Sequence, residues 1–163
     1  MADAHSSIIV LFGDVTKSLS DVLAFGYGAG DDFNSIKNKK YPTVWVDPIT
    51  GNFDTKDSQV GNTIRWTISV NFVEPDQKTG NEEETARVWS SMFKLMEEWL
   101  HKLDQMLVDP QDTTGMRISS QQAEIQSPSF RNRRKITKDL ATGWNLTFTF
   151  ITQSDFDYCS IYE

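Results

Sequence analysis

One stretch of the chain, from Glu82 to Val108, constrains the possible folds more than any other. Negative charge at Glu82, Glu83 and Glu84 suits the N-terminus of a helix, and Pro110 ends the stretch because the residue before a proline leaves the helical region. A helix of this length, about 40 Å at roughly 1.5 Å per residue, needs a sheet or other helices to cover its apolar side. Apolar residues recur at three- and four-residue spacing, the pattern of an amphipathic helix: Val88, Trp89, Met92, Phe93, Met96, Trp99, Leu100, Leu103, Met106 and Leu107.

Segments with strand character lie on both sides of this helix and can supply a sheet. Pro42–Asp47 is rich in β-branched and aromatic residues, which favour strands. Met116–Gln126 is more polar, and its pattern slips phase between Ile118 and Ile125, which predicts a bulge or break. Two segments alternate apolar and polar residues, as strands with one buried face do: Thr63–Glu74 and Thr142–Thr152.

The N-terminal part predicts a second helix, residues 6–25, because its apolar residues fall mostly on one side. Gly26–Gly30 would end that helix, since glycine readily takes the left-handed conformation at a helix C-terminus. Polar residues predict a loop over Asp31–Lys40 and a turn around Pro48 and Thr50–Asn52. The order helix, strand, strand, long helix, strand, strand predicts an α+β fold, a mostly antiparallel sheet packed against the two helices.

Length and composition place limits on the class of protein. A chain of 163 residues predicts one domain over 1–163, with a polar loop at about 53–62, a basic arm at about 127–140 and a C-terminal tail at 153–163. The net charge of -7 argues against nucleic-acid binding through the charge of the whole chain. The single cysteine, Cys159, cannot form an internal disulfide and fits a reducing compartment. We expect neither a signal peptide nor a membrane span, because no apolar run approaches the required length.

Residues able to carry catalysis or bind a metal are sparse, and each has a structural interpretation that we prefer. His101 has Asp104 one turn along the long helix, but the sequence places no serine or cysteine beside it, and His5 lies near the N-terminus. Gly26–Gly30 lacks the lysine and the serine or threonine of a phosphate-binding loop. The clustered carboxylates, such as Asp31-Asp32, do not follow the spacing of a calcium loop. We therefore expect no catalytic residue, no cofactor and no metal site.

Opposite charges at two places in the chain favour assembly. Four bases fall within residues 131–135, and such a run would be stabilised by an acidic partner surface. The acidic start of the long helix has the opposite sign, so copies of the chain could attract head to tail and close into a ring. Aromatic residues in the C-terminal tail predict that it docks on a neighbour. The predicted interface residues are Arg131, Arg133, Arg134, Lys135, Glu82, Glu83, Glu84, Phe156 and Tyr158.

Five features, in this order, carry a resemblance to a known family: Pro42–Asp47, the strand ending Phe72-Val73-Glu74-Pro75, the helix from Glu82, the polar strand near Ile118–Ile125 and the closing Gly143–Phe150. Together they span about Ser6 to Thr152. In pattern, size and element order the chain resembles the tail-terminator and neck (head-to-tail joining) ring proteins of tailed bacteriophages. The resemblance includes no diagnostic motif, and the aromatic richness, the polar loop and the C-terminal tail depart from the family's pattern.

This resemblance implies a structural protein of the virion, made in the host cytoplasm, that assembles into a ring of six or twelve copies. The ring would join head and tail in the neck or at the top of the tail tube, beside portal, neck or tail-tube proteins. DNA would pass through its lumen without sequence-specific binding, which suits an acidic chain. The family has no catalytic residues to carry over, and no membrane association is implied.

Three alternatives stay open from the sequence. The chain resembles less closely a tail-tube or baseplate subunit, which would have more strand and a shorter helix. A small intracellular enzyme using His101 would need a concave pocket with converging polar groups. A nucleic-acid-binding regulator using the basic arm would show DNA affinity that falls steeply with salt.

Overall fold

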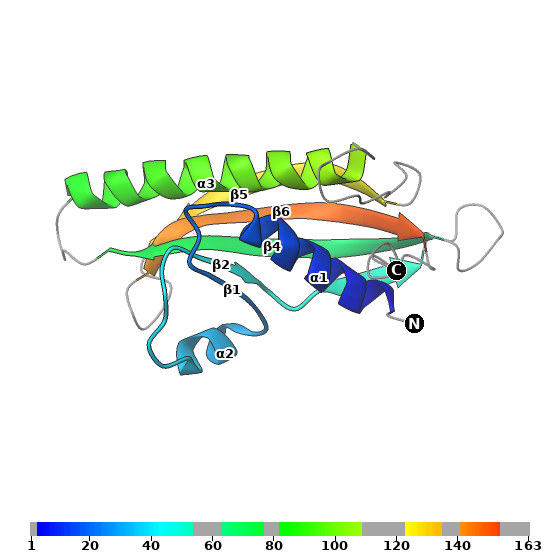
Figure 1. Cartoon of the computed structure of the whole chain (residues 1–163), viewed down its shortest axis with the longest axis horizontal. Coiled ribbons are helices and arrows are strands. Elements are labelled where there is room, and N and C mark those ends of the chain that lie inside the picture. The colour runs from blue at the N-terminus through cyan, green and yellow to red at the C-terminus, as the bar shows by residue number, and fades with distance from the viewer. Residues whose placement is uncertain (1–2, 54–62, 77–81, 109–122, 135–140, 154–163) are drawn as a thin grey trace.

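A computed structural model of the chain describes residues 3–53, 63–76, 82–108, 123–134 and 141–153 (Figure 1). The predicted residues Lys135, Phe156 and Tyr158, and the polar loop and C-terminal tail beyond 53 and 153, lie outside the described residues. In chain order the elements are α1 (Ala4–Lys17), β1 (Ala24–Tyr27), α2 (Gly30–Ser35), β2 (Thr43–Val46), β3 (Thr50–Phe53), β4 (Thr63–Pro75), α3 (Glu82–Val108), β5 (Ala123–Arg133) and β6 (Ala141–Gln153).

The described strands form one mixed sheet of six, in the order β1-β2-β4-β6-β5, with β3 also paired to β4. Only β1 and β2 run parallel; the other pairs are antiparallel. The central pair, β4 and β6, stays in register from Thr63 opposite Gln153 to Pro75 opposite Ala141. Together with the long helix packed on this sheet, the pairing confirms the predicted α+β class.

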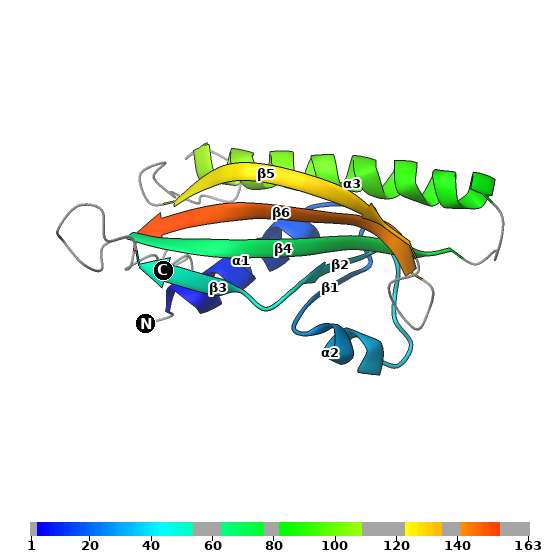
Figure 2. The same cartoon turned by 180° about the vertical axis from the view of Figure 1, so that it is seen from behind.

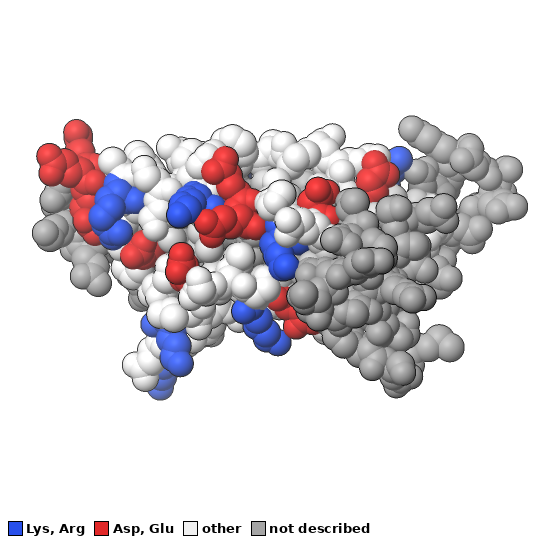
Figure 3. Space-filling model, turned by 45° about the horizontal axis from the view of Figure 1, so that its top comes forward, with Lys and Arg blue, Asp and Glu red and all other residues white. Residues whose placement is uncertain are grey.

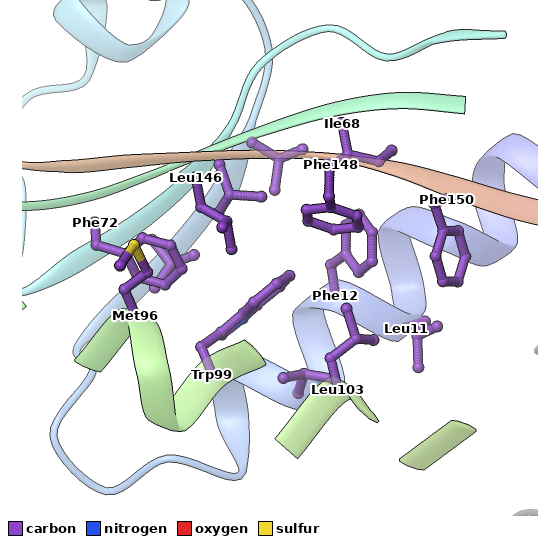
Figure 4. Close-up of a cluster of buried hydrophobic side chains, with 14 of the residues drawn as sticks. Leu11, Phe12, Ile68, Phe72, Met96, Trp99, Leu103, Leu146, Phe148 and Phe150 are labelled. Carbon is purple, nitrogen blue, oxygen red and sulfur yellow. The ribbon is translucent and has the colours of Figure 1, made fainter. Parts of the chain in front are cut away.

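Helices α1 and α3 cover the same face of the sheet, where the main core lies (Figure 1). Trp99 of α3 is fully buried and stands between Phe12 of α1 and Phe72 of β4, with ring centroids 5.3 Å and 5.7 Å away (Figure 4). Edge-to-face ring pairs of this kind add to the free energy gained by burial. The alternating residues of β4 and β6 meet this cluster because directly opposite positions of antiparallel strands share a face, as Val70 and Leu146 do.

On the opposite face of the sheet, the described part of the chain places a helix near β2, where α2 packs. Phe33 of α2 lies edge-to-face against Trp45 of β2, with ring centroids 4.9 Å apart, and Val73 and Ala141 complete a small second core. Seen from behind, β4 and β6 cross in front of α1 (Figure 2). We call this side of β4, β5 and β6 the open face.

The prediction for the first helix was wrong at its C-terminal end. Helix α1 stops at Lys17, with Ser18 donating its hydroxyl to Val15 O, and residues 24–27 form a strand. Strand β1 pairs in parallel with β2, and these hydrogen bonds between distant segments override the helical period of the local sequence. Gly26 therefore ends no helix: a Cβ there would lie 2.3 Å from Trp45 Cζ3, so glycine leaves room for the indole.

Two further elements replace predicted loops. Helix α2, residues 30–35, takes up the first half of the predicted loop Asp31–Lys40. The Asp32 carboxylate accepts from the backbone N–H of Ala29 at the start of this helix. The predicted turn around Thr50 contains β3, which pairs with the first half of β4. Strand β2 pairs with the second half of β4 on the same side. Short segments of this kind gain their stability from pairing rather than from a local pattern.

Strand β5 contains the first part of the predicted basic arm. Arg131 and Arg133 belong to the strand and pair with Asn145 and Gly143 of β6. Most of the predicted break between Ile118 and Ile125 lies outside the described residues, whereas the pairing of β5 with β6 shifts register between Gln126 and Ser129. Ser127, with φ of 52°, takes the left-handed conformation there, before Pro128, so the pairing resumes one register step further on.

Candidate assembly surfaces

The outer strand β5 presents two arginines on the open face. Arg131 and Arg133 stand opposite Asn145 and Gly143, whereas the alternate residues Phe130 and Asn132 point to the helix-covered face. The Arg131 side chain is exposed and Arg133 is half-buried, and within the described part of the chain neither guanidinium forms an ion pair. These two predicted interface residues are therefore free to meet an acidic surface.

An aromatic cluster, which we call the edge cluster, joins α3 to β5 and β6: Trp89, Phe93, Phe130 and Trp144. The rings of Phe93, Phe130 and Trp144 pack edge-to-face, with centroids 5.1–5.7 Å apart. Trp89 Nε1 donates to Arg133 O at 3.2 Å, and Trp144 Nε1 donates to Trp89 O at 2.8 Å. Phe130 nevertheless stays 55% exposed, so the cluster leaves an aromatic surface at the edge of the sheet.

The acidic start of α3 and the described part of the basic arm lie at the same end of one molecule. Arg134 Nε lies 3.9 Å from Oδ2 of the fully buried Asp76, which also accepts from Thr85 Oγ1 at 2.6 Å. Glu84 accepts from Arg87 at 2.9 Å, and this hydrogen bond raises the pKa of Arg87. Arg134 and Glu84 thus have partners in their own chain. Glu82 and Glu83 lie in the first turn of α3 and are both exposed.

A groove of about 450 Å³ runs between the C-terminal half of α3 and β5. Its lining combines apolar side chains with exposed acids and His101: Glu97, Leu100, His101, Asp104, Ile125 and Pro128. The four α3 residues follow the spacing of one helix face. His101 Nε2 lies 3.1 Å from Gln105 Nε2, one turn along the same helix.

An enzyme that uses His101 would need a concave pocket with polar groups around this side chain. The groove is concave and has polar groups beside His101. However, Glu97, His101 and Asp104 are all exposed, and the hydrogen bond of His101 is to a neighbour on its own helix. No buried acceptor orients the imidazole among the described residues, as a catalytic base requires. The groove combines exposed carboxylates with apolar side chains.

The loop from α2 to β2 is a basic protrusion that the sequence showed only as a cluster of lysines. Ile36 is 44% exposed there and is followed by Lys37, Lys39 and Lys40. Lys39 Nζ stacks over the Phe33 ring at 5.1 Å from its centroid, which ties the loop to α2. Acidic side chains run along the α3 side of the molecule, and basic side chains project where α2 lies (Figure 3).

Polar side chains form a hydrogen-bonded row across the open face, which sequence reasoning missed. Ser69 Oγ donates to Asp47 Oδ2 at 2.6 Å, and Asn145 Nδ2 donates to Ser69 Oγ and to Asn71 Oδ1. Asn145 is only 1% exposed, and no donor reaches its Oδ1 from the residues that the structure describes. Alternation identified these positions as polar, but only the register brings them side by side.

The remaining candidates have structural roles. His5 Nε2 lies 3.0 Å from the hydroxyl of Tyr27, and Asp3 caps α1 by accepting from Ser6 N at 2.8 Å. Over the described ranges, no group of three or more histidine, cysteine, aspartate or glutamate side chains could hold a metal ion. None of the described helices is both long and apolar enough to cross a membrane.

No protein-family model matches the sequence, and no curated protein matches it.

Proposed function

We propose that this protein is a structural subunit of a tailed-bacteriophage virion that assembles into a ring in the neck or at the top of the tail tube. The ring would hold six or twelve copies, contact portal, neck or tail-tube proteins, and let DNA pass through its lumen. The proposal joins the family resemblance of the sequence to the surfaces described above.

The observation that carries the proposal is the exposed edge strand β5. Among the described strands it is the outer one beside β6, and most of its eleven residues are exposed. An outer strand offers unpaired backbone groups to another chain. Pro128 and the bulge interrupt the first half, which leaves Ser129–Arg133 as the part best suited to a neighbour. The exposed ring of Phe130 adds apolar area there.

Charge supports the same proposal. A conduit for DNA must not hold phosphates tightly, and the chain carries a net charge of -7. Arginines at the outer strand can instead meet acidic surfaces of neighbouring subunits, and such contacts weaken as salt rises.

Native mass spectrometry and negative-stain images of the purified full chain test the proposal. The expected result is closed rings with an open centre, in six or twelve copies. Only monomers across a concentration series, both alone and with the other neck and tail proteins of the same virus, would contradict it.

A matched pair of variants tests the role of β5. We expect Arg131→Ser to weaken assembly more at low than at high salt, because an ion pair between subunits is lost. Lys17→Ser removes the same charge from an exposed site on α1 and should assemble like the parent. Equal assembly of the two variants would remove Arg131 from the interface.

A further inference from the structure

Two surfaces with matching chemistry lie at opposite edges of the sheet. One is the groove between α3 and β5, and the other is the loop between α2 and β2, beside β1. In both cartoon views α3 and α2 stand on opposite sides of the sheet (Figures 1 and 2). The two surfaces of one molecule therefore cannot meet each other, but those of two copies can.

The groove offers an apolar floor and an acidic rim. Leu100, Ile125 and Pro128 supply the apolar surface, and Glu97 and Asp104 supply two exposed carboxylates. With about 450 Å³ of space, the groove can accept more than one side chain. An occupant with an apolar side chain flanked by cations would satisfy both parts of this lining.

The loop Ile36–Lys40, which we call the lysine knob, has this chemistry. Ile36 exposes an apolar side chain, and Lys37 and Lys40 are exposed on the same loop. Asn38 takes the left-handed conformation, with φ of 55°, which turns the chain sharply at the middle of the knob. The hydroxyl of Thr43 donates to Lys40 O and holds the knob to the start of β2.

We infer that the lysine knob of one copy docks in the α3–β5 groove of the next copy. Ile36 would cover the apolar floor, while Lys37 and Lys40 would pair with Glu97 and Asp104. Because the two surfaces differ and lie on opposite edges, the contact is head to tail, and repeated contacts close into a ring when the rotation between copies permits. The inference rests on the proposed ring assembly and specifies its subunit interface.

Charge reversal in two separate chains tests this contact. The groove variant carries Glu97→Lys with Asp104→Lys, and the knob variant carries Lys37→Glu with Lys40→Glu. Each alone should assemble at least about tenfold more weakly, because like charges then face each other. Lys39 is left unchanged because it stacks on Phe33 within the chain.

Mixing the two variants in equal amounts gives the deciding result. The reversed groove then meets the reversed knob, and the unchanged groove meets the unchanged knob, so assembly should return with the two chains alternating. Asp14→Lys with Glu98→Lys makes the same charge change outside the groove and should leave assembly unaffected. If the single variants fail and their mixture also fails, or if each assembles like the parent, the inference is wrong.

Disulfide crosslinking provides an independent measurement. Lys37→Cys with Asp104→Cys, in a chain that also carries Cys159→Ser, should give a ladder of linked subunits under oxidation that disappears on reduction. The single-cysteine chains should give no ladder. Rings that form without crosslinking would overturn this contact and leave the proposed function intact, whereas the absence of any ring would contradict both.

Discussion

The indole Nε1 of Trp99 on α3 donates a hydrogen bond of 2.9 Å to Oγ1 of Thr16 on α1, and both side chains are buried. The Thr16 hydroxyl in turn donates a hydrogen bond of 2.8 Å to Phe12 O on the same helix. The two helices that cover the sheet are thus joined by a polar contact inside an otherwise apolar core.

Thr16→Val should destabilise the fold by about 1–3 kcal/mol, because the Trp99 N–H is then buried without an acceptor while the shape of the side chain is kept. Urea unfolding monitored by Trp fluorescence measures the change. Thr67→Val, at an exposed position of β4, is the matched control and should stay within about 0.5 kcal/mol of the parent. Equal stability of the two variants would show that the hydrogen bond contributes nothing.

Gly143→Ala should lower the free energy of unfolding by about 3 kcal/mol or more, or prevent folding, because the added methyl group would overlap the backbone of β4. A Cβ at residue 143 would lie 1.8 Å from Phe72 O on the neighbouring strand β4, which side-chain movement cannot relieve. Gly30→Ala is the control, since nothing lies within 4 Å of a Cβ there. Soluble yield and thermal unfolding compare the two, and a normally stable Gly143→Ala chain would mean that β4 and β6 are not paired in this register.

Asn145→Asp should destabilise the protein by about 2 kcal/mol or more at neutral pH, because it replaces the Nδ2 donor to Ser69 and Asn71 by a buried carboxylate. Burial raises the pKa of the introduced carboxyl above its unfolded value of about 3.9, so the penalty should shrink as the pH falls and the group is protonated.

Unfolding free energies of the Asn145→Asp chain over a pH series test this sign. Asn52→Asp adds the same charge at an exposed position of β3 and should show little penalty at any pH. If Asn145→Asp lowers the free energy of unfolding equally at acidic and neutral pH, the introduced carboxylate is not buried.

The N-cap of α1 predicts a second pH effect, of opposite sign. The Ser6 backbone N–H bond lowers the pKa of Asp3 below its ordinary value, so its stabilising effect is present above the unfolded pKa and is lost as the pH falls through the folded pKa. Asp3→Ala should therefore lower the midpoint of thermal unfolding at about pH 7 and make little difference at about pH 2.5. A midpoint difference that persists in acid would contradict the cap assignment.

Part of the candidate site followed from the sequence and part required the fold. Residues 131–135 stood out as basic without any structure, because four like charges in five residues are unusual locally. That Arg131 and Arg133 face outward from a strand, while Arg134 lies beside Asp76, depends on the register of β5 on β6. The groove could not be predicted, because its α3 and β5 residues come together only when both elements pack on the sheet.

The sequence by itself determined α3, β4 and β6, because each is long enough for its own period to identify it and to select its buried face. The tertiary structure alone decided the short elements: the end of α1 at Lys17, the strand β1, the helix α2 and the strand β3. Four to six residues carry too few local interactions to specify a conformation. Their hydrogen bonds and packing, such as β1 on β2 and Phe33 on Trp45, come from partners distant in sequence.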